Sequence, residues 1–171
     1  ATELRVWLWQ TWKRRISGIL VWQTNYWTSS AAYPDAPQNP YEDPMGWRSG
    51  YSTPKGTKRP WGNGDGRFMY PPEAAADGRP DAPVFEPPVD CIRFEMLRDG
   101  IEDYEYMAML ARLLEEHGDA LAPDEHARLE ALLDVPPEVS RSLTEFTWRP
   151  EPIEAHRAKV AAAIAALSAG N

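Results

Sequence analysis

Apolar residues recur at helical spacing in four stretches of the chain, residues 3–16, 89–117, 123–133 and 152–168. The first stretch ends in three consecutive cations, which suit the negative end of a helix dipole. The second is the longest, and two prolines set an extended entry to it. We therefore predict four helices, three of them in the second half of the chain.

One apolar run between the first two helices has a different character. Residues 19–23 are rich in β-branched and aromatic side chains, which predicts a short buried strand. Residues 24–27, Thr-Asn-Tyr-Trp, then add hydrogen-bonding groups and two large rings. An apolar run that ends in polar and aromatic side chains is typical of the C-terminal end of a barrel strand, where packing stops and binding begins.

Residues 29–88 show no sustained periodicity, and their repeated Pro, Gly, Asn and Asp residues predict turns. A loop of this length in a compact domain is expected mainly over a functional site. Within it, three glycines at positions 62, 64 and 66 permit close backbone approach. Residues 67–70, which follow them, predict a short strand.

One strand and four helices do not make a closed fold, because a lone buried strand needs hydrogen-bonded neighbours. We therefore predict an α/β fold in which the chain is the C-terminal segment of a (β/α)8 barrel, about its seventh helix, eighth strand and eighth helix. The N-terminal part of the same barrel would then be an obligatory partner, encoded in sequence not shown. Residues 1–117 would form the closing segment, with residues 29–88 as an active-site loop, and residues 118–171 a helical extension.

Composition and charge exclude several classes of protein. Hydrophobic residues make up 43% of the 171 positions, which excludes wholesale disorder and suits one domain. The net charge of -8 argues against nucleic acid or an anionic membrane as the main partner. No apolar run approaches the roughly 18 residues that a membrane span needs. Most of the 8 Trp and 17 Pro lie in the first half, which indicates that this half binds and the helical half supports it.

The single cysteine, Cys91, permits no intrachain disulfide and no cysteine-based zinc site. The histidines at positions 117, 126 and 156 lack the spacing of a metal site, so we expect neither a metal nor another cofactor. The first five residues do not resemble a signal peptide. An exported protein, secreted or held at a bacterial cell surface, would carry its signal upstream of this chain.

Four motifs together resemble a known family. They are residues 9–13 (WQTWK), 18–27 (GILVWQTNYW), 64–71 (GDGRFMYP) and 92–106 (IRFEMLRDGIEDYEY). In this order they resemble the C-terminal part of glycoside hydrolase family 123 and the related domain of unknown function 4091. The resemblance covers residues 5–110 and, more loosely, the helical tail.

The resemblance implies a (β/α)8 barrel and the removal of terminal β-N-acetylgalactosamine, with the substrate's own acetamido oxygen as nucleophile. In that family an adjacent Asp-Glu pair on an earlier barrel strand does the chemistry, so no catalytic residue is expected in this chain. The Asp124-Glu125 dipeptide follows Pro123 as a helix start and is not that pair. Lys13, Arg14 and Arg15, Cys91, and the Pro-rich loop at 34–60 depart from the family pattern, which leaves the exact sugar open.

Six residues are candidates for contact with a carbohydrate substrate. They are Trp22, Asn25, Tyr26, Trp27, Asp65 and Tyr70. Indole rings offer apolar platforms for a sugar, while amide, carboxylate and phenol groups bond its hydroxyls.

Each candidate also has a structural alternative. Trp22 lies within the predicted strand, where packing is favoured over stacking, whereas Trp27 lies at its mouth, where stacking is favoured. Asn25 and Asp65 also suit turns, and Tyr70 precedes a proline that could direct it into packing. Arg93 could hold a loop carboxylate or the ligand, although a structural role is favoured.

The acidic residues Asp99, Glu102, Asp103 and Glu105 invite comparison with paired catalytic carboxylates. Glu102 and Asp103 point to different helix faces, so we interpret the group as structural. Three functions are consistent with the sequence: part of an N-acetylhexosaminidase, a related barrel hydrolase for another sugar, or a non-catalytic carbohydrate-binding or scaffold module.

Overall fold

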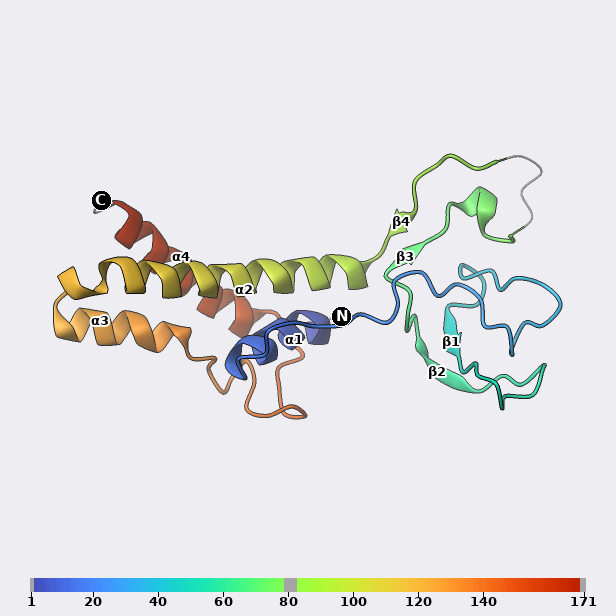
Figure 1. Ribbon diagram of the computed structural model, residues 1–171, viewed down its shortest axis with the longest axis horizontal. Coiled ribbons are helices and arrows are strands. Elements are labelled where there is room, and N and C mark those ends of the chain that lie inside the picture. Colours follow the sequence, from blue (N-terminus) through green and yellow to red (C-terminus); the bar gives the residue numbers. More distant parts are fainter. Residues whose placement is uncertain (1, 79–82, 170–171) are drawn as a thin grey trace. The chain divides into compact units, whose positions relative to one another are not determined.

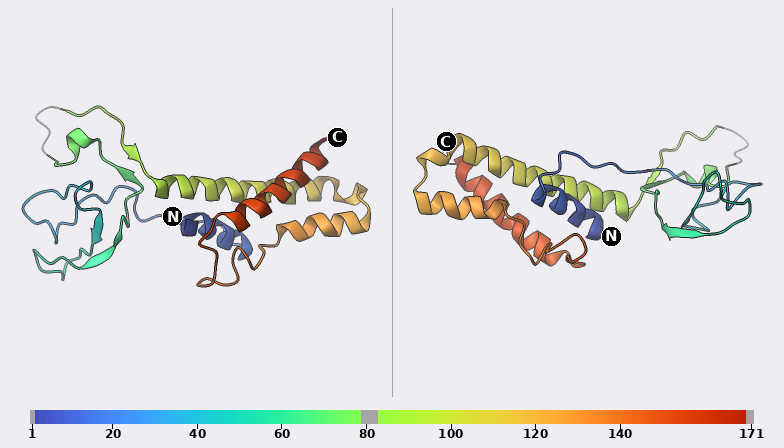
Figure 2. Two further views of the ribbon diagram at one scale, coloured as in Figure 1. Left: turned by 180° about the vertical axis from the view of Figure 1, so that it is seen from behind. Right: turned by 60° about the horizontal axis from the view of Figure 1, so that its bottom comes forward.

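The computed structural model describes residues 2–78 and 83–169, which form two compact units. One, the helical unit, comprises residues 1–19 and 96–171; the other, the loop unit, comprises residues 20–95. The described residues hold four α-helices and two small antiparallel sheets, which is compatible with part of an α/β fold (Figures 1 and 2). Each unit is described in turn.

The helical unit contains α1 (Thr2–Lys13), most of α2 (Ile92–His117), α3 (Pro123–Glu130) and α4 (Glu151–Ala169). Two 3₁₀ turns, η2 (Gly118–Ala120) and η3 (Ala131–Leu133), flank α3. All four predicted helices are therefore confirmed, with ends that differ by at most three residues. Three ends differ by three residues: α1 stops early, α2 starts late, and α3 stops early, where η3 follows it.

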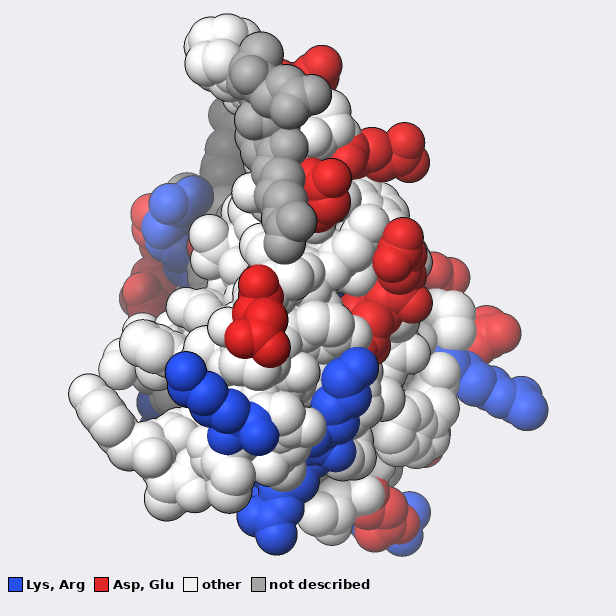
Figure 3. Space-filling model, turned by 90° about the vertical axis from the view of Figure 1, so that its right-hand side faces the viewer, with Lys and Arg blue, Asp and Glu red and all other residues white. Residues whose placement is uncertain are grey.

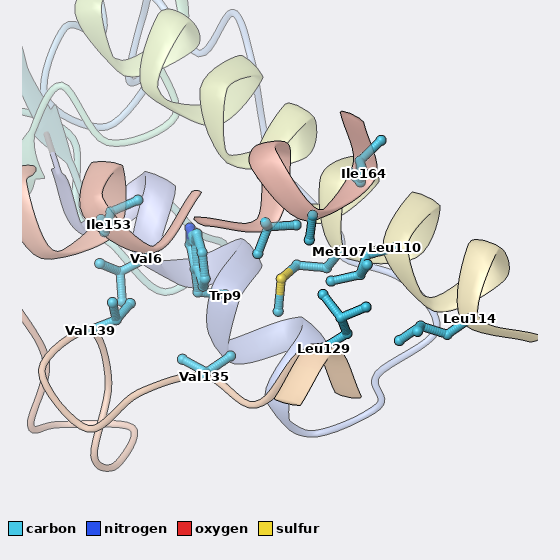
Figure 4. Close-up of a cluster of buried hydrophobic side chains, with 12 residues drawn as sticks. Val6, Trp9, Met107, Leu110, Leu114, Leu129, Val135, Val139, Ile153 and Ile164 are labelled. Atoms are coloured by element: carbon cyan, nitrogen blue, oxygen red, sulfur yellow. The ribbon is translucent and has the colours of Figure 1, made fainter. Parts of the chain in front are cut away.

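The core of the helical unit joins all four helices and the segment before α4 (Figure 4). Its buried members are Val6, Trp9, Met107, Leu110, Leu114, Leu129, Val135, Val139, Ile153, Val160, Ala163 and Ile164. Gly100 lets α1 and α2 approach closely, because a Cβ atom there would lie 3.1 Å from the Arg5 backbone. No helix among the described residues is both long and apolar enough to cross a bilayer.

A buried carboxylate ties three of these helices together. Asp103 on α2 is 2% exposed and accepts from Arg5 Nε at 2.6 Å, Arg5 Nη2 at 3.0 Å and Trp9 Nε1 at 2.8 Å on α1. From α4, Arg157 Nε lies 3.3 Å from Asp103 Oδ1. Burial alone would lower the pKa of Arg5, but Asp103 beside it holds that pKa above its usual value. The structural interpretation of this acidic group is thus supported for Asp103.

The end of α1 shows why the helix is shorter than predicted. The Ile16 N–H donates to the Thr11 carbonyl at 3.0 Å and the Arg15 N–H donates to the Trp12 carbonyl at 2.9 Å, which is a Schellman motif. Arg15 occupies the left-handed position of this motif, with φ of 53°. Glycine is usual at this position, and its absence here explains why the helix was predicted to run three residues too far, to residue 16.

The predicted buried strand at residues 19–23 was wrong. These residues form no regular secondary structure, and the side chains of Leu20 and Trp22 are 78% and 81% exposed. Composition favours a strand there, but an extended segment becomes one only by pairing, and none of the strands described in this chain pairs with it.

The loop unit contains two short strand pairs, of which only one strand was predicted. β1 (Met45–Trp47) pairs with β2 (Pro60–Asn63), and β3 (Met69–Tyr70) pairs with β4 (Val89–Asp90). A 3₁₀ turn, η1 (Glu73–Ala75), lies between the last two. The strand expected at residues 67–70 is confirmed for its last two residues. β1 and β2 were not predicted, because the surrounding Pro and Gly residues indicated turns. Gly46 faces Gly62 and Trp47 faces Pro60, so Trp61 is an extra residue in a β-bulge.

We expect Arg15→Gly to stabilise the helical unit by about 1 kcal/mol, because glycine adopts the left-handed conformation without the steric penalty of a side chain. Urea unfolding followed by circular dichroism measures the change. Arg15→Ala is the matched control, since it removes the same side chain but keeps the Cβ atom. Equal gains from both variants would show that the backbone conformation is not the cause.

We expect Asp103→Asn to destabilise the helical unit by about 3–5 kcal/mol, because two arginine side chains would lose their shared buried counter-charge. Glu102→Gln is the control: its pairs with Arg98 at 3.1 Å and Arg157 at 3.3 Å are half-exposed and should contribute at most about 1 kcal/mol. The same unfolding measurement compares the two, and similar losses would contradict the central role of Asp103.

Candidate functional site

The loop unit carries a hollow of about 480 Å³ whose lining includes four aromatic side chains. Its principal lining residues are Trp22, Tyr26, Trp47, Arg48, Trp61 and Asp65. They come from three separate segments: the irregular stretch after α1, strand β1 with the residue that follows it, and strand β2 with the turn that follows it. Such a mixture of apolar rings and a few polar groups is typical of a small-molecule site.

Two of the rings are fixed in place by contacts within the unit. The Trp47 indole N–H donates to Asp43 Oδ2 at 2.7 Å. The Tyr26 backbone N–H donates to the Gly66 carbonyl at 2.8 Å, and a Cβ on Gly66 would lie 2.9 Å from the Tyr26 Cβ. Gly66 also has φ of 72°, so a larger residue there would displace the Tyr26 ring.

The other two rings are open to solvent. Trp22 is 81% exposed and Trp61 is 68% exposed. The bulge at Trp61 gives this residue a backbone direction that regular pairing would not. Large exposed aromatic side chains in one hollow are uncommon on a protein surface and mark a binding surface.

Asp43 organises the wall behind Trp47. Its carboxylate accepts from the Tyr33 hydroxyl at 2.5 Å, from the Trp47 indole and from the Met45 backbone N–H at 3.0 Å. Burial raises the pKa of this carboxyl, but these hydrogen bonds and the charge of Lys58 outweigh burial and hold the pKa below its usual value. The ionised form of Asp43 is therefore part of the folded loop unit.

Arg67 is fully buried beneath the turn that carries Asp65. Its Nη1 donates to the Pro44 carbonyl and its Nη2 to the Trp27 carbonyl at 3.2 Å, while its Nε has no hydrogen-bond partner among the described residues. Burial lowers the pKa of its guanidinium. By joining residues 27, 44 and 67, this side chain sets the spacing of the three segments that line the hollow.

Three of the six predicted site residues line the hollow and three do not. Trp22, Tyr26 and Asp65 line it. The Trp27 indole instead donates to the Met69 carbonyl at 2.8 Å, and Asn25 is exposed, with its backbone in an isolated bridge to Arg67.

Tyr70 packs elsewhere in the loop unit. Its hydroxyl accepts from Arg93 Nη2 at 3.0 Å, and its ring lies 5.3 Å from that of Tyr41. Arg93 also donates from Nε to the Arg67 carbonyl at 2.9 Å, and its guanidinium lies against Gly64. The partners of Arg93 are thus neutral oxygens rather than a carboxylate, and its position supports the structural role.

Comparison with known protein families decides the membership of the chain. Residues 1–110 match the family described as glycoside hydrolase 123, catalytic domain. The chain belongs to glycoside hydrolase family 123. No curated protein matches it.

The family region contains the whole hollow. The match ends within α2, after the last of the four sequence motifs. Residues 18–27 supply Trp22 and Tyr26, and residues 64–71 supply Asp65, so two of the motifs that carry the family resemblance meet at the hollow. The resemblance to family 123 noted from the sequence is therefore confirmed.

Sequence reasoning missed three lining residues: Trp47, Arg48 and Trp61. They lie in the Pro- and Gly-rich stretch, where no periodicity indicates which side chains share a face. One signal was present in the sequence, because each of the two tryptophans has a cation nearby. Arg48 follows Trp47 directly, and Arg59 precedes Trp61 with one proline between them. The stretch from residue 44 to residue 64 also contains four Lys or Arg and no Asp or Glu.

Two larger grooves lie in the helical unit, and two polar side chains of the larger one are engaged in hydrogen bonds. The larger, about 1040 Å³, is lined by Trp12 and Lys13 among others. The Trp12 indole donates to the Leu133 carbonyl at 2.8 Å, and the Lys13 ammonium donates to the Ser140 carbonyl at 2.6 Å. The other, about 570 Å³, is lined mostly by Ala and Leu. Across the described residues, no group of three His, Cys, Asp or Glu side chains could hold a metal ion.

We expect acid to weaken the loop unit through Asp43. A carboxyl whose folded pKa lies below its unfolded value, about 3.9, stabilises the fold above that value and loses this contribution as the pH falls through the folded pKa. Tryptophan fluorescence during urea unfolding at pH 7 and pH 3 would detect the loss. In Asp43→Asn the loss of stability between pH 7 and pH 3 should be smaller. The control Asp35→Asn, which changes an exposed residue, should lose as much stability as the unmodified chain. If Asp43→Asn loses as much as well, Asp43 is not the group responsible.

Proposed function

We propose that the chain is the C-terminal portion of a glycoside hydrolase that acts on terminal N-acetylhexosamine, of the β-N-acetylgalactosaminide type, by a substrate-assisted retaining mechanism. The chain supplies part of the wall that binds the sugar. Family membership supports the reaction class. The observation that supports this binding site is the aromatic hollow, which is lined by residues of two of the family motifs.

The hollow has the chemistry that a pyranose ring requires. The exposed faces of Trp22 and Trp61 offer apolar surface to the C–H face of a sugar. Asp65 is exposed at the same hollow, where its carboxylate can accept hydrogen bonds from hydroxyl groups. The fixed rings of Tyr26 and Trp47 form the floor between them.

The catalytic pair of the proposed mechanism lies outside this chain. Asp124 and Glu125 are exposed in the first turn of α3, where they suit the positive end of the helix dipole. An adjacent Asp and Glu on an earlier barrel strand would act, the Glu as acid toward the leaving oxygen and the Asp as the partner of the acetamido group. The chain by itself is then inactive.

The exposed segment after α1 supports the barrel part of the proposal. Leu20 and Trp22 lie in a segment with the composition of a strand, but it pairs with no strand among the described residues. Pairing with a preceding strand of the same barrel would bury Leu20 and leave the following residues at the strand mouth. In this proposal residues 1–117 close the barrel, residues 29–88 cover the site and residues 118–171 extend it.

A non-catalytic carbohydrate-binding module is the second candidate. It is favoured by the same hollow, which needs no catalytic pair to bind a sugar. Assays of the full protein on chromogenic N-acetylgalactosaminide, N-acetylglucosaminide and galactoside distinguish the candidates. Hydrolysis that requires the acetamido group supports the proposal, hydrolysis of the galactoside alone supports a different sugar, and binding without hydrolysis supports the module.

We expect Trp22→Ala in the full protein to weaken the binding of N-acetylgalactosamine by about 1–3 kcal/mol, because it removes an exposed stacking surface. Isothermal titration calorimetry measures the affinity. Trp27→Phe is the control, since it removes an N–H that is bonded to the Met69 carbonyl and should lower stability rather than affinity. The opposite pattern would place the sugar at Trp27, as strand position alone suggested.

A further inference from the structure

The segment that contains β1 and β2 is rich in cations, although the protein as a whole is acidic. Residues 44–64 contain Arg48, Lys55, Lys58 and Arg59 and no acidic residue, although the whole chain carries a net charge of -8. All four cations are exposed. Figure 3 shows several Lys and Arg side chains close together on the side of the molecule where β1 and β2 lie in Figure 1.

Among these cations, Arg48 is the one that lines the hollow. Its guanidinium carbon lies over the Trp61 ring, 5.5 Å from the ring centroid, which is a cation–π contact. Its backbone N–H also donates to the Arg59 carbonyl at 2.8 Å. The charged group is therefore positioned at the hollow by a cation–π contact rather than by an acidic partner.

Arg48 makes no ion pair with any residue that the structure describes. A guanidinium that stacks on an aromatic ring keeps its in-plane N–H groups free, and these suit planar or tetrahedral anions. Lys58 differs, because its ammonium donates to the Tyr33 hydroxyl at 3.1 Å and lies 4.4 Å from the centre of that ring. The hollow thus presents one cation, Arg48, that forms no ion pair among the described residues, and one carboxylate, Asp65.

We infer that the sugar bound in this hollow carries an anionic substituent, a sulfate ester or a carboxylate, and that Arg48 binds it. Asp65 lines the same hollow and would repel an anion, so the substituent lies toward Arg48 and the unmodified hydroxyls lie toward Asp65. The two side chains then fix the direction of the sugar across the tryptophan rings. This inference rests on the proposed function, because it assigns a substrate class to the same hollow.

Titration calorimetry of the full protein with three monosaccharides tests it: N-acetylgalactosamine, its 6-sulfate and galacturonic acid. We expect one of the two anionic sugars to bind about tenfold more tightly than the neutral one, as a charge-assisted hydrogen bond implies. Preference for the 6-sulfate identifies a sulfate ester and preference for galacturonic acid identifies a carboxylate. The preference should shrink as salt rises.

Arg48→Gln should abolish the preference for the anionic sugar over N-acetylgalactosamine. Lys55→Gln makes the same charge change outside the hollow and should keep the preference. Equal affinities for neutral and anionic sugars, or a preference that survives Arg48→Gln, would overturn the inference while sparing the proposed function. Failure of all three sugars to bind would instead refute the proposed function itself.

Discussion

The helical unit depends on one buried carboxylate. Asp103 takes hydrogen bonds or ionic contacts from α1 and α4 while standing on α2, so the three longest helices share a single charged centre. Around it, the apolar core fills the space between the helices, and Gly100 permits the close approach of α1. A buried charge of this kind costs desolvation and tolerates only one arrangement of its partners, which fixes how these helices pack.

The loop unit is also held together by charged side chains that bind polar groups of other segments. Arg67 is buried and joins carbonyls from two distant segments, and Asp43 collects three donors behind Trp47. Short strands and many prolines bury little apolar surface, so polar contacts to the backbone hold this unit's shape. These contacts hold together the segments that form the aromatic hollow, which is the candidate site of the family region.

Helix positions could be predicted because apolar spacing reports directly on a helix face: Ile153, His156, Val160 and Ile164 of α4 are buried as their spacing indicated. The strand predicted at residues 19–23 is not formed, because strand pairing depends on partners that local composition does not reveal. The site was half predicted. Trp22, Tyr26 and Asp65 lie in recognisable motifs. The other three residues, Trp47, Arg48 and Trp61, reach the hollow through strand pairing and a bulge, which the periodicity of the sequence does not indicate.

A crystal structure of the full protein with bound N-acetylgalactosamine would test the central claim most directly. The account predicts that the sugar ring lies on Trp22 or Trp61, with a hydroxyl group within hydrogen-bonding distance of the Asp65 carboxylate. A structure in which another part of the protein fills this hollow and the sugar binds without touching either tryptophan would contradict it.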